Sequence, residues 1–410
     1  MNMNAQPIRS VTLLGSSSGR NAGDAALIAA IMDNVDRALG RRVRYEIPTP
    51  RPEYIRDHYP NDAHPVGMMP WQASVKMLGL PTLRSILRTD LTLVFDAILF
   101  DRSLYNPLFN FLSTLYLLLP LARRFGKRMG CYNVSVGPIR TRPGARMLRR
   151  VLECMDFVAV RDTEALGLFR EIGLEHPRVC VTADAAIGAP AADRAKVDEI
   201  FRKAGLAPGE PVLGININRY LDTWASKSRP PMGAEAFLGT YAGALNRVWR
   251  ELRVPLAFVC TQHHDVAITQ ELMRRLEPDV RTALIANRDH DHAETKGALG
   301  RLDLLCGMRL HSLILASSGL APIIGIAYQP KVNYYFNTLG LGDYVLSFDD
   351  FTGEKLADHI LRGWRERARL RATLEQHIPA MTRLAARTAD LVAAMDRGGD
   401  LDDALRSWPT

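Results

Sequence analysis

Residues 305–331 read LCGMRLHSLILASSGLAPIIGIAYQPK and form the most informative stretch of the sequence. An apolar strand breaks at Gly307, an apolar helix opens near Arg309 and His311, and a second apolar strand ends at Tyr328. Strands that are apolar throughout are typical of parallel strands covered on both faces. The stretch therefore predicts one strand-helix-strand unit of a parallel sheet.

The same alternation runs along most of the chain and predicts two doubly wound α/β domains. The predicted strands fall into two series, namely Val11–Ser16, Arg41–Ile47, Leu91–Leu99, Arg128–Val136, Phe157–Val160 and Val179–Thr182, then Val212–Ile217, Leu256–Thr261, Ala283–Ala286, Leu304–Cys306 and Ile323–Ala327. The predicted boundaries are an N-terminal domain 1–188, a linker 189–211, a C-terminal domain 212–350 and a helical tail 351–410. Two such domains suggest a substrate cleft at the carboxyl ends of their strands.

Composition narrows the class of protein. The 410 residues are 47% hydrophobic and 23% charged, which is ordinary for globular domains and excludes a disordered or fibrous chain. The net charge of +8 permits anionic partners, but no basic-aromatic motif indicates nucleic acid. The five cysteines form no C-x-x-C pair, and no signal peptide or transmembrane span is predicted. We therefore expect a cytoplasmic protein.

Three basic side chains interrupt the apolar sequence of residues 305–331. Arg309 and His311 open the helix, and Lys331 follows the second strand. If the two strand ends are neighbours, these side chains converge on one anion such as a phosphate or carboxylate. The alternative for His311 is a buried or capping histidine.

Two further strand ends carry candidate ligand residues. Residues 15–24 read GSSSGRNAGD before an apolar helix, a pattern that is neither a Walker A loop nor a G-x-G-x-x-G fingerprint. Its alternative is a plain turn in which Asp24 caps the helix. Arg161 ends the strand Phe157–Val160, where ligands bind in such folds. Its alternative is an ion pair with Asp162 or another neighbour.

Together these motifs resemble the polysaccharide pyruvyl transferase family over roughly residues 10 to 350. The resemblance is carried by Asn21-Ala-Gly-Asp24, Val136-Gly-Pro138, Val160-Arg-Asp162, Ala183-Asp184, Gly307-Met-Arg-Leu-His311 and Tyr328-Gln-Pro-Lys331. It implies a two-domain fold similar to GT-B glycosyltransferases. It also implies transfer of the pyruvyl group of phosphoenolpyruvate to a sugar as a ketal, with no metal or cofactor.

The resemblance also implies site residues. Arg161, His311 and Lys331 would bind phosphoenolpyruvate, and Arg309 would be a further anion contact. The candidate catalytic residues are His311, as the general acid-base group, and Arg161. The N-terminal domain would be the acceptor side and the C-terminal domain the donor side. Tentative acceptor contacts are Gly15, Asn21, Asp24, Asp96, Asn216, His263 and His264, although Asn216 would equally cap the following segment.

One departure from the family is visible near Asp96. Relatives commonly carry three glycines at the end of this strand, where residues 93–101 here read LVFDAILFD. Glycines allow a close backbone approach, so their loss suggests a reshaped acceptor pocket or a different reaction. Two alternatives therefore stay open: a glycosyltransferase of similar fold that uses a nucleotide sugar, and a non-catalytic glycan-binding relative.

Two other patterns have weaker functional readings. Residues 289–292 read DHDH but lack metal-site spacing, which favours a solvated loop. Residues 104–122 are leucine-rich and precede a basic run, which fits a peripheral membrane contact or, more simply, a core helix. The sequence does not identify the acceptor sugar or its hydroxyl pair. It leaves open whether the acceptor is lipid-linked, nucleotide-linked or polymeric.

Overall fold

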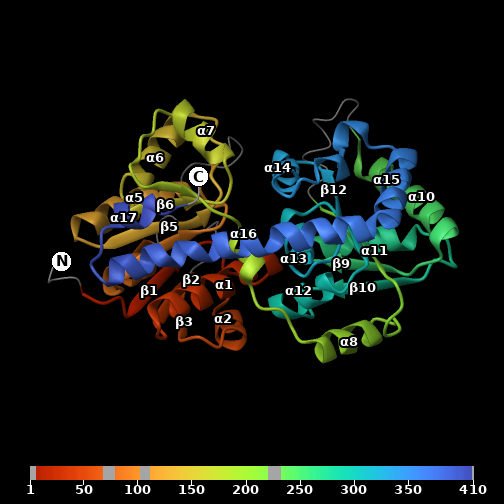
Figure 1. Cartoon of the computed structure of the whole chain (residues 1–410), viewed down its shortest axis with the longest axis horizontal. Helices are drawn as coiled ribbons and strands as arrows, with labels where there is room; N and C mark the ends of the chain where they lie inside the picture. The colour runs from red at the N-terminus through yellow and green to blue at the C-terminus, as the bar shows by residue number, and fades with distance from the viewer. Residues whose placement is uncertain (1–5, 68–78, 102–110, 220–231, 409–410) are drawn as a thin grey trace. The chain divides into compact units, whose positions relative to one another are not determined.

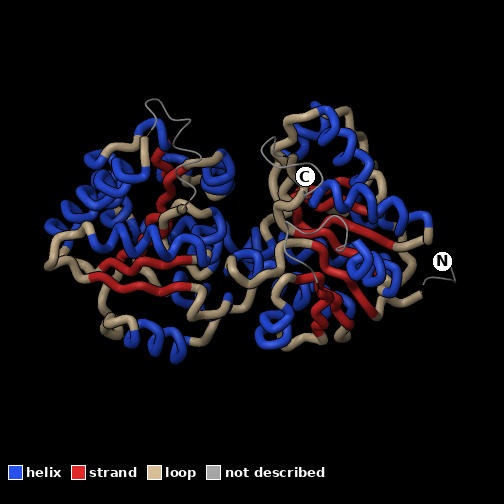
Figure 2. The backbone as a smooth tube through the Cα atoms, turned by 180° about the vertical axis from the view of Figure 1, so that it is seen from behind, coloured by secondary structure: helices blue, strands red, loops and turns tan. Residues whose placement is uncertain are grey.

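A computed structural model describes residues 6–67, 79–101, 111–219 and 232–408. The chain divides into two compact units. The first unit comprises Met1–Gly19, Asp24–Ala189 and Met381–Thr410, and the second comprises Arg20–Gly23 and Pro190–Ala380. In each unit the strands form a central sheet with helices on both faces (Figure 2).

The first unit has a parallel seven-stranded sheet in the order β3-β2-β1-β4-β5-β6-β7. Its strands are β1 (Ser10–Leu14), β2 (Arg44–Thr49), β3 (Ala63–Gly67), β4 (Leu91–Phe95), β5 (Arg128–Val134), β6 (Phe157–Val160) and β7 (Val179–Val181). The chain first places β2 and β3 on one side of β1, and then places β4, β5, β6 and β7 on the other side. The carboxyl ends of β1 and β4 are therefore the topological switch point of this sheet.

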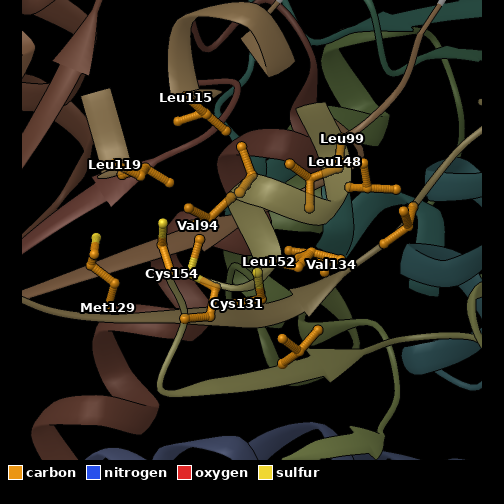
Figure 3. Close-up of a cluster of buried hydrophobic side chains, with 14 of the residues drawn as sticks. Val94, Leu99, Leu115, Leu119, Met129, Cys131, Val134, Leu148, Leu152 and Cys154 are labelled. Carbon is orange, nitrogen blue, oxygen red and sulfur yellow. The ribbon is translucent and has the colours of Figure 1, made fainter. Parts of the chain in front are cut away.

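The helices of the first unit bury apolar faces against this sheet. They are α1 (Ala22–Leu39), α2 (Pro52–His58), α4 (Gly79–Arg88), α5 (Phe111–Arg124), α6 (Arg142–Leu152), α7 (Glu164–Glu171) and α17 (Leu401–Arg406). Figure 3 shows part of the resulting core, where Leu115 and Leu119 of α5 and Leu148 of α6 lie over Val94 and Cys131 of the sheet. The free cysteines of the chain are all buried, as expected for reduced core residues.

The second unit has a parallel six-stranded sheet in the order β10-β9-β8-β11-β12-β13. Its strands are β8 (Leu213–Asn216), β9 (Leu256–Cys260), β10 (Thr282–Ala286), β11 (Leu304–Gly307), β12 (Ile323–Ala327) and β13 (Val345–Ser347). Its helices are α8 (Arg194–Lys203), α10 (Ala234–Leu252), α11 (Val266–Arg274), α12 (His292–Gly300), α13 (Leu310–Ser318), α14 (Pro330–Thr338) and α15 (Gly353–Arg365). Here the switch point lies between β8 and β11.

A long helix, α16 (Arg367–Asp396), contributes residues to both units, because the boundary falls after Ala380 (Figure 1). Its last turns bind the first unit through Asn133, whose side-chain amide donates to the carbonyls of Ala183 and Ala385, each at 2.9 Å. Thr388 of α16 donates back to the Asn133 side chain at 2.5 Å. A buried amide thus joins the helical tail to the first sheet.

The predicted fold class is confirmed: two parallel α/β sheets with a helical tail. The prediction missed β3 and β13, which are short, partly exposed edge strands without an apolar run. The predicted linker 189–211 contains α8, and from Pro190 onward it falls in the second unit. The end of the predicted tail, from Met381, falls in the first. Pro120 lies inside α5.

Candidate functional site

The candidate site of the second unit is built around the buried side chain of Asn216, the last residue of β8. Its amide nitrogen donates to the Val259 carbonyl at 2.8 Å. Its oxygen accepts hydrogen bonds from the Arg309 backbone at 3.1 Å and from the Ser312 hydroxyl at 2.8 Å. Asn216 thus ties the ends of β8 and β9 to the start of α13, a distant element, and these bonds do not cap the segment that directly follows Asn216.

Arg309, the residue before α13, is held by a carboxylate that the sequence analysis did not single out. Its Nε contacts Oδ2 of Asp265, and its Nη2 lies 2.8 Å from Oδ1 of the same side chain. Nη2 also donates to Asn218 at 3.1 Å. The Asp265 side chain is fully buried and that of Arg309 is 12% exposed. This two-point ion pair fixes the guanidinium plane at the sheet edge.

His311 and Lys331 lie in the first turns of two helices that follow neighbouring strands. His311 is the second residue of α13, after β11, and Lys331 is the second residue of α14, after β12. β11 and β12 pair in parallel, so both helices begin at the same edge of the sheet. Backbone N–H groups at helix N-termini favour anions, and two basic side chains there add to this preference.

The segment Arg20–Gly23 packs on the same edge of the second unit. The Ala22 backbone donates to Thr261 at 2.8 Å, and the Arg20 carbonyl accepts from the His263 backbone and the Asn287 side chain, each at 3.0 Å. Asn21 forms an isolated antiparallel bridge with Gln262. The glycine of this segment is placed against His311, because a Cβ built on Gly23 would lie 2.2 Å from the His311 ring.

The alternative for Asp24, that it caps the helix, is wrong, whereas its proposed acceptor contact stays a prediction. The helix α1 begins at Ala22, and the Asn21 side chain accepts a hydrogen bond from the Gly23 backbone at 3.0 Å. Asn21 therefore caps the helix, and Asp24 lies inside its first turn. The nearby His264 lies in a 3₁₀ turn, His263–Asp265, with its Nδ1 at 3.5 Å from the Arg219 guanidinium.

In the first unit, Gly15 and Asp96 follow the switch-point strands. A Cβ on Gly15 would lie 2.5 Å from the Phe95 ring, so only glycine fits beside that side chain. Asp96 is buried and has a φ of 68°, a conformation that glycine adopts most readily. The backbone at Asp96 thus adopts a conformation typical of glycine although the residue is an aspartate.

Arg161 follows β6 and pairs with Asp184, which lies just beyond the neighbouring strand β7. The Nη1–Oδ2 distance is 2.5 Å, and the two side chains are 6% and 5% exposed. Burial alone would lower the pKa of Arg161, but the carboxylates of Asp184, Asp96 and Asp162 outweigh it and raise that pKa. Arg161 therefore stays charged. Its ion-pair partner is Asp184, whereas Asp162 caps the next helix by accepting from the Ala165 backbone at 3.2 Å.

The predicted site residues thus divide between the two units. Arg309, His311 and Lys331 share one sheet edge of the second unit, together with Asn216, His263 and His264. Gly15, Asp24, Asp96 and Arg161 belong to the first unit. The convergence of Arg161 with the other cations stays a prediction.

The Asp-His-Asp-His pattern of residues 289–292 lies in the second unit and has a structural explanation. Asp291 caps α12 by accepting from the Glu294 backbone at 2.8 Å, and His290 lies 3.2 Å from the Glu294 carboxylate. In the described ranges, no group of three or more His, Cys, Asp or Glu side chains is arranged to hold a metal ion.

Comparison with solved structures shows the fold. A putative UDP-N-acetylglucosamine 2-epimerase from Listeria monocytogenes is 12% identical, with 96% of this chain and 98% of that chain covered and a TM-score of 0.66. A UDP-GlcNAc 2-epimerase from Neisseria meningitidis, bound to UDP-GlcNAc, is 10% identical, with 93% and 99% covered and a TM-score of 0.62. Anabaena Alr3699/HepE in complex with UDP-glucose is 12% identical, with 95% and 99% covered and a TM-score of 0.58. These similarities indicate a GT-B-type fold.

Comparison by sequence identifies the family. Among curated proteins, none matches the chain significantly. The family model described as polysaccharide pyruvyl transferase matches residues 21–330, well over half of the chain and including every motif from Asn21 to Pro330. The chain therefore belongs to the polysaccharide pyruvyl transferase family.

Proposed function

We propose that this transferase moves the pyruvyl group of phosphoenolpyruvate onto a sugar of a glycan or glycan precursor, forming a pyruvate ketal. One observation carries the proposal. Arg309, His311 and Lys331 occur at the starts of two helices that leave adjacent strands β11 and β12, beside the switch point of the second unit. In open α/β sheets, ligands bind at such carboxyl ends.

The charge of the donor matches this sheet edge. Phosphoenolpyruvate carries a phosphate and a carboxylate, so its site needs several cations in fixed positions. Asp265 neutralises part of the positive charge of Arg309 but holds its guanidinium group in a fixed orientation. His311, Lys331 and the two helix N-termini then supply the excess positive potential. We extend the proposal to Arg161 on the family resemblance, because a guanidinium stays charged even where it is buried against a carboxylate such as that of Asp184.

The proposed chemistry assigns His311 as the general acid-base group. A proton is added to the methylene carbon C3 of phosphoenolpyruvate, and a sugar hydroxyl attacks C2 and loses its proton. The C2–O bond to phosphate then breaks, and a second sugar hydroxyl attacks C2 and loses its proton to close the ketal. Inorganic phosphate leaves with the electron pair of the broken bond, stabilised by the fixed cations. The step needs no oxidant or reductant, and the proposal includes no metal.

The acceptor is proposed to be a sugar with two suitably placed hydroxyls, and the reaction is proposed to be cytoplasmic. Gly15, Asn21, Asp24, Asp96, His263 and His264 stay proposed acceptor contacts. Asn216 is a weaker candidate, because both ends of its side-chain amide already bond to the protein.

A nucleotide-sugar glycosyltransferase is the competing function. It is favoured by fold neighbours whose structures contain UDP-glucose or UDP-GlcNAc. The first test is calorimetric titration of the full chain with phosphoenolpyruvate, UDP-glucose and GDP-mannose, each with and without EDTA. We expect saturable binding of phosphoenolpyruvate that EDTA does not change. Binding should weaken strongly in Lys331→Met and His311→Asn but not in the control His264→Asn.

Each other outcome has a defined meaning. Binding of a nucleotide sugar in place of phosphoenolpyruvate would overturn the proposed donor and leave only the fold in common. Binding of sugars without any affinity for phosphoenolpyruvate would support the non-catalytic alternative. Equal loss of affinity in His264→Asn would place the donor away from the starts of α13 and α14.

A further inference from the structure

The first unit exposes a row of large apolar side chains on α5 and its neighbour α4. Leu117, Leu121 and Phe125 are 63%, 40% and 63% exposed, and Tyr116 is 38% exposed. Leu80, at the start of α4, is 61% exposed. The two helices pack together, since a Cβ on Gly79 would lie 3.8 Å from Leu118. We call these five residues the apolar ridge.

The ridge lies on the side of α5 that does not face the core. Leu115 and Leu119 point into the buried cluster (Figure 3), together with Leu112, Leu118 and Ala122. Leu117 and Leu121 are four residues apart on α5 and share its outer face, and the exposed Phe125 directly follows the last residue of the helix, Arg124. A helix that is apolar all round is expected to be buried on all sides. Here the outer half is exposed in the described part of the chain.

The chain around the ridge is basic. Residues 79–88 and 111–128 contain six arginines and lysines and neither aspartate nor glutamate. Arg84, Arg88, Arg123 and Arg124 are exposed. Arg88 and Arg123 also pair with Glu46 and Asp156 from other elements, at 2.7 Å and 2.8 Å. An exposed apolar face rimmed by cations complements a surface that is apolar inside and anionic outside.

We propose that the apolar ridge docks the first unit on an anionic lipid bilayer, with Leu117, Leu121 and Phe125 entering the boundary between headgroups and acyl chains. The arginines of α4 and α5 then contact acidic headgroups. A second copy of this chain fits less well, because a symmetric dimer through the ridge would bring like charges together. The docking is peripheral, since no helix among the described residues is long and apolar enough to cross a membrane.

The sequence pattern that pointed to this face began at residue 104. Residues 104–110 lie outside the described residues, and none of them belongs to the apolar ridge. The proposal is independent of phosphoenolpyruvate, because vesicle binding is measured without substrates. If it holds, acceptors carried on a lipid are the substrate class that the docked enzyme meets at highest local concentration.

Co-sedimentation of the full chain with lipid vesicles tests the proposal. One set of vesicles is phosphatidylcholine alone, and the other contains phosphatidylglycerol. We expect binding to the phosphatidylglycerol vesicles that weakens as salt rises. The triple variant Leu117→Ser, Leu121→Ser and Phe125→Ser should lower the partition coefficient at least tenfold. Because these side chains are exposed, the variant should unfold at the wild-type temperature.

Two control variants carry substitutions of the same type as the test variants, but in the second unit, away from the apolar ridge. Tyr334→Ser removes an exposed aromatic side chain, 37% exposed, from α14 of the second unit. Arg194→Gln with Arg202→Gln removes two exposed charges from α8 and is compared with Arg84→Gln and Arg124→Gln. We expect the controls to bind vesicles like wild type and the Arg84 and Arg124 pair to bind severalfold less.

Three results would overturn the proposal. The first is no binding to the phosphatidylglycerol vesicles. The second is binding that the triple variant leaves unchanged. The third is a wild-type dimer in sedimentation velocity without lipid that the triple variant converts to monomer, since the ridge would then be covered by a second copy.

Discussion

Each unit carries one arginine paired with a buried aspartate at the carboxyl edge of its sheet, but the surroundings of the two pairs differ. Arg161 pairs with Asp184, and Asp96 and Asp162 add further negative charge around it. Arg309 pairs with Asp265, and His311 and Lys331 follow at the starts of α13 and α14. The first edge is thus rich in carboxylates and the second is rich in cations.

The two ion pairs consist of the same residue types but have different roles. A buried arginine among carboxylates is needed by the fold, since its removal leaves unpaired buried charge. An arginine fixed by one aspartate beside two further cations belongs to an edge that attracts anions. Loss of Arg161 should therefore cost mainly stability, and loss of the second-unit cations should cost mainly binding and turnover.

The largest effect is expected from His311→Asn. Removal of a general acid-base group typically lowers turnover by about a hundredfold to ten-thousandfold. We expect at least a thousandfold loss of phosphate release from phosphoenolpyruvate in the presence of mixed hexose and hexosamine acceptors, a loss within that range. His290→Asn in the same unit is the matched control, since His290 pairs with Glu294 and is not a proposed site residue. Near-normal turnover in His311→Asn would contradict the proposal that His311 is the general acid-base group.

Arg161→Ala should destabilise the first unit by about 3–5 kcal/mol, the usual cost of leaving one charge of a buried pair without its partner. The measurement is urea unfolding followed by hydrogen exchange in peptides of β6 and β7. Arg161→Lys keeps a charge beside Asp184 and should recover much of the loss. The exposed pair Arg247–Asp358 provides the control, since Arg247→Ala should leave the free energy of unfolding nearly unchanged.

This comparison also tests the proposed donor contact of Arg161. If Arg161→Lys folds normally and binds phosphoenolpyruvate like wild type, Arg161 serves the fold alone. If stability is recovered and affinity is not, the guanidinium contacts the donor. A mild phenotype in Arg161→Ala would contradict the view that Asp184 depends on this arginine.

Gly23→Ala should displace His311, because the added Cβ would lie 2.2 Å from the imidazole ring. A shift of about 1 Å in a catalytic group can cost a hundredfold in rate, so we expect a loss of turnover of roughly tenfold to a hundredfold. Affinity for phosphoenolpyruvate should change less than turnover. Gly243→Ala in α10, where nothing lies within 4 Å of the added atom, is the control. Equal turnover in both variants would show that Gly23 does not position His311.

Lys331→Met should weaken phosphoenolpyruvate binding by about tenfold, as expected for one charge-assisted hydrogen bond worth about 1.5 kcal/mol. The titration is repeated at rising salt, where the difference between wild type and variant should shrink. Unchanged affinity at low salt would place Lys331 outside the donor site.

Most of the fold was predictable because its strands are buried on both faces. Every predicted strand overlaps a strand of the structure, and Phe157–Val160 and Ile323–Ala327 agree at both ends. The edge strand Ala63–Gly67 escaped prediction because it contains Pro65 and is partly exposed. Its position depends on pairing with β2, which local sequence does not encode.

The cations of the site were predictable, but their partners were not. Arg309 and Asp265 are 44 residues apart in sequence and meet because β8, flanked by β9 and β11, brings their loops together. Arg161 and Asp184 meet because β6 and β7 are neighbours. Knowledge of strand order would have paired both, since parallel strands end at one edge. Contacts of Arg20–Gly23 with Thr261 and His263 had no local signal at all.

The smallest effect is a loss of stability of the second unit in mild acid. His359 of α15 has a buried Nε2, and burial, with the nearby Arg362, lowers its pKa to about 4 from its ordinary value of 6.5. The unfolded chain therefore binds the proton more readily, and stability present above pH 6.5 is lost as pH falls toward 4. At about pH 5.5 the loss is on the order of 1 kcal/mol.

Urea unfolding of wild type and His359→Gln at neutral and mildly acidic pH measures how much of the acid-induced loss of stability is due to His359. The variant should lose less stability on acidification, and the difference should appear in exchange-protected peptides of β12 and α15 but not in those of β6. The exposed His264→Gln should follow wild type at every pH. If His359→Gln keeps the full acid sensitivity, the proton taken up on unfolding belongs to another group. The acid response would then not distinguish the second unit from the carboxylate-rich first one.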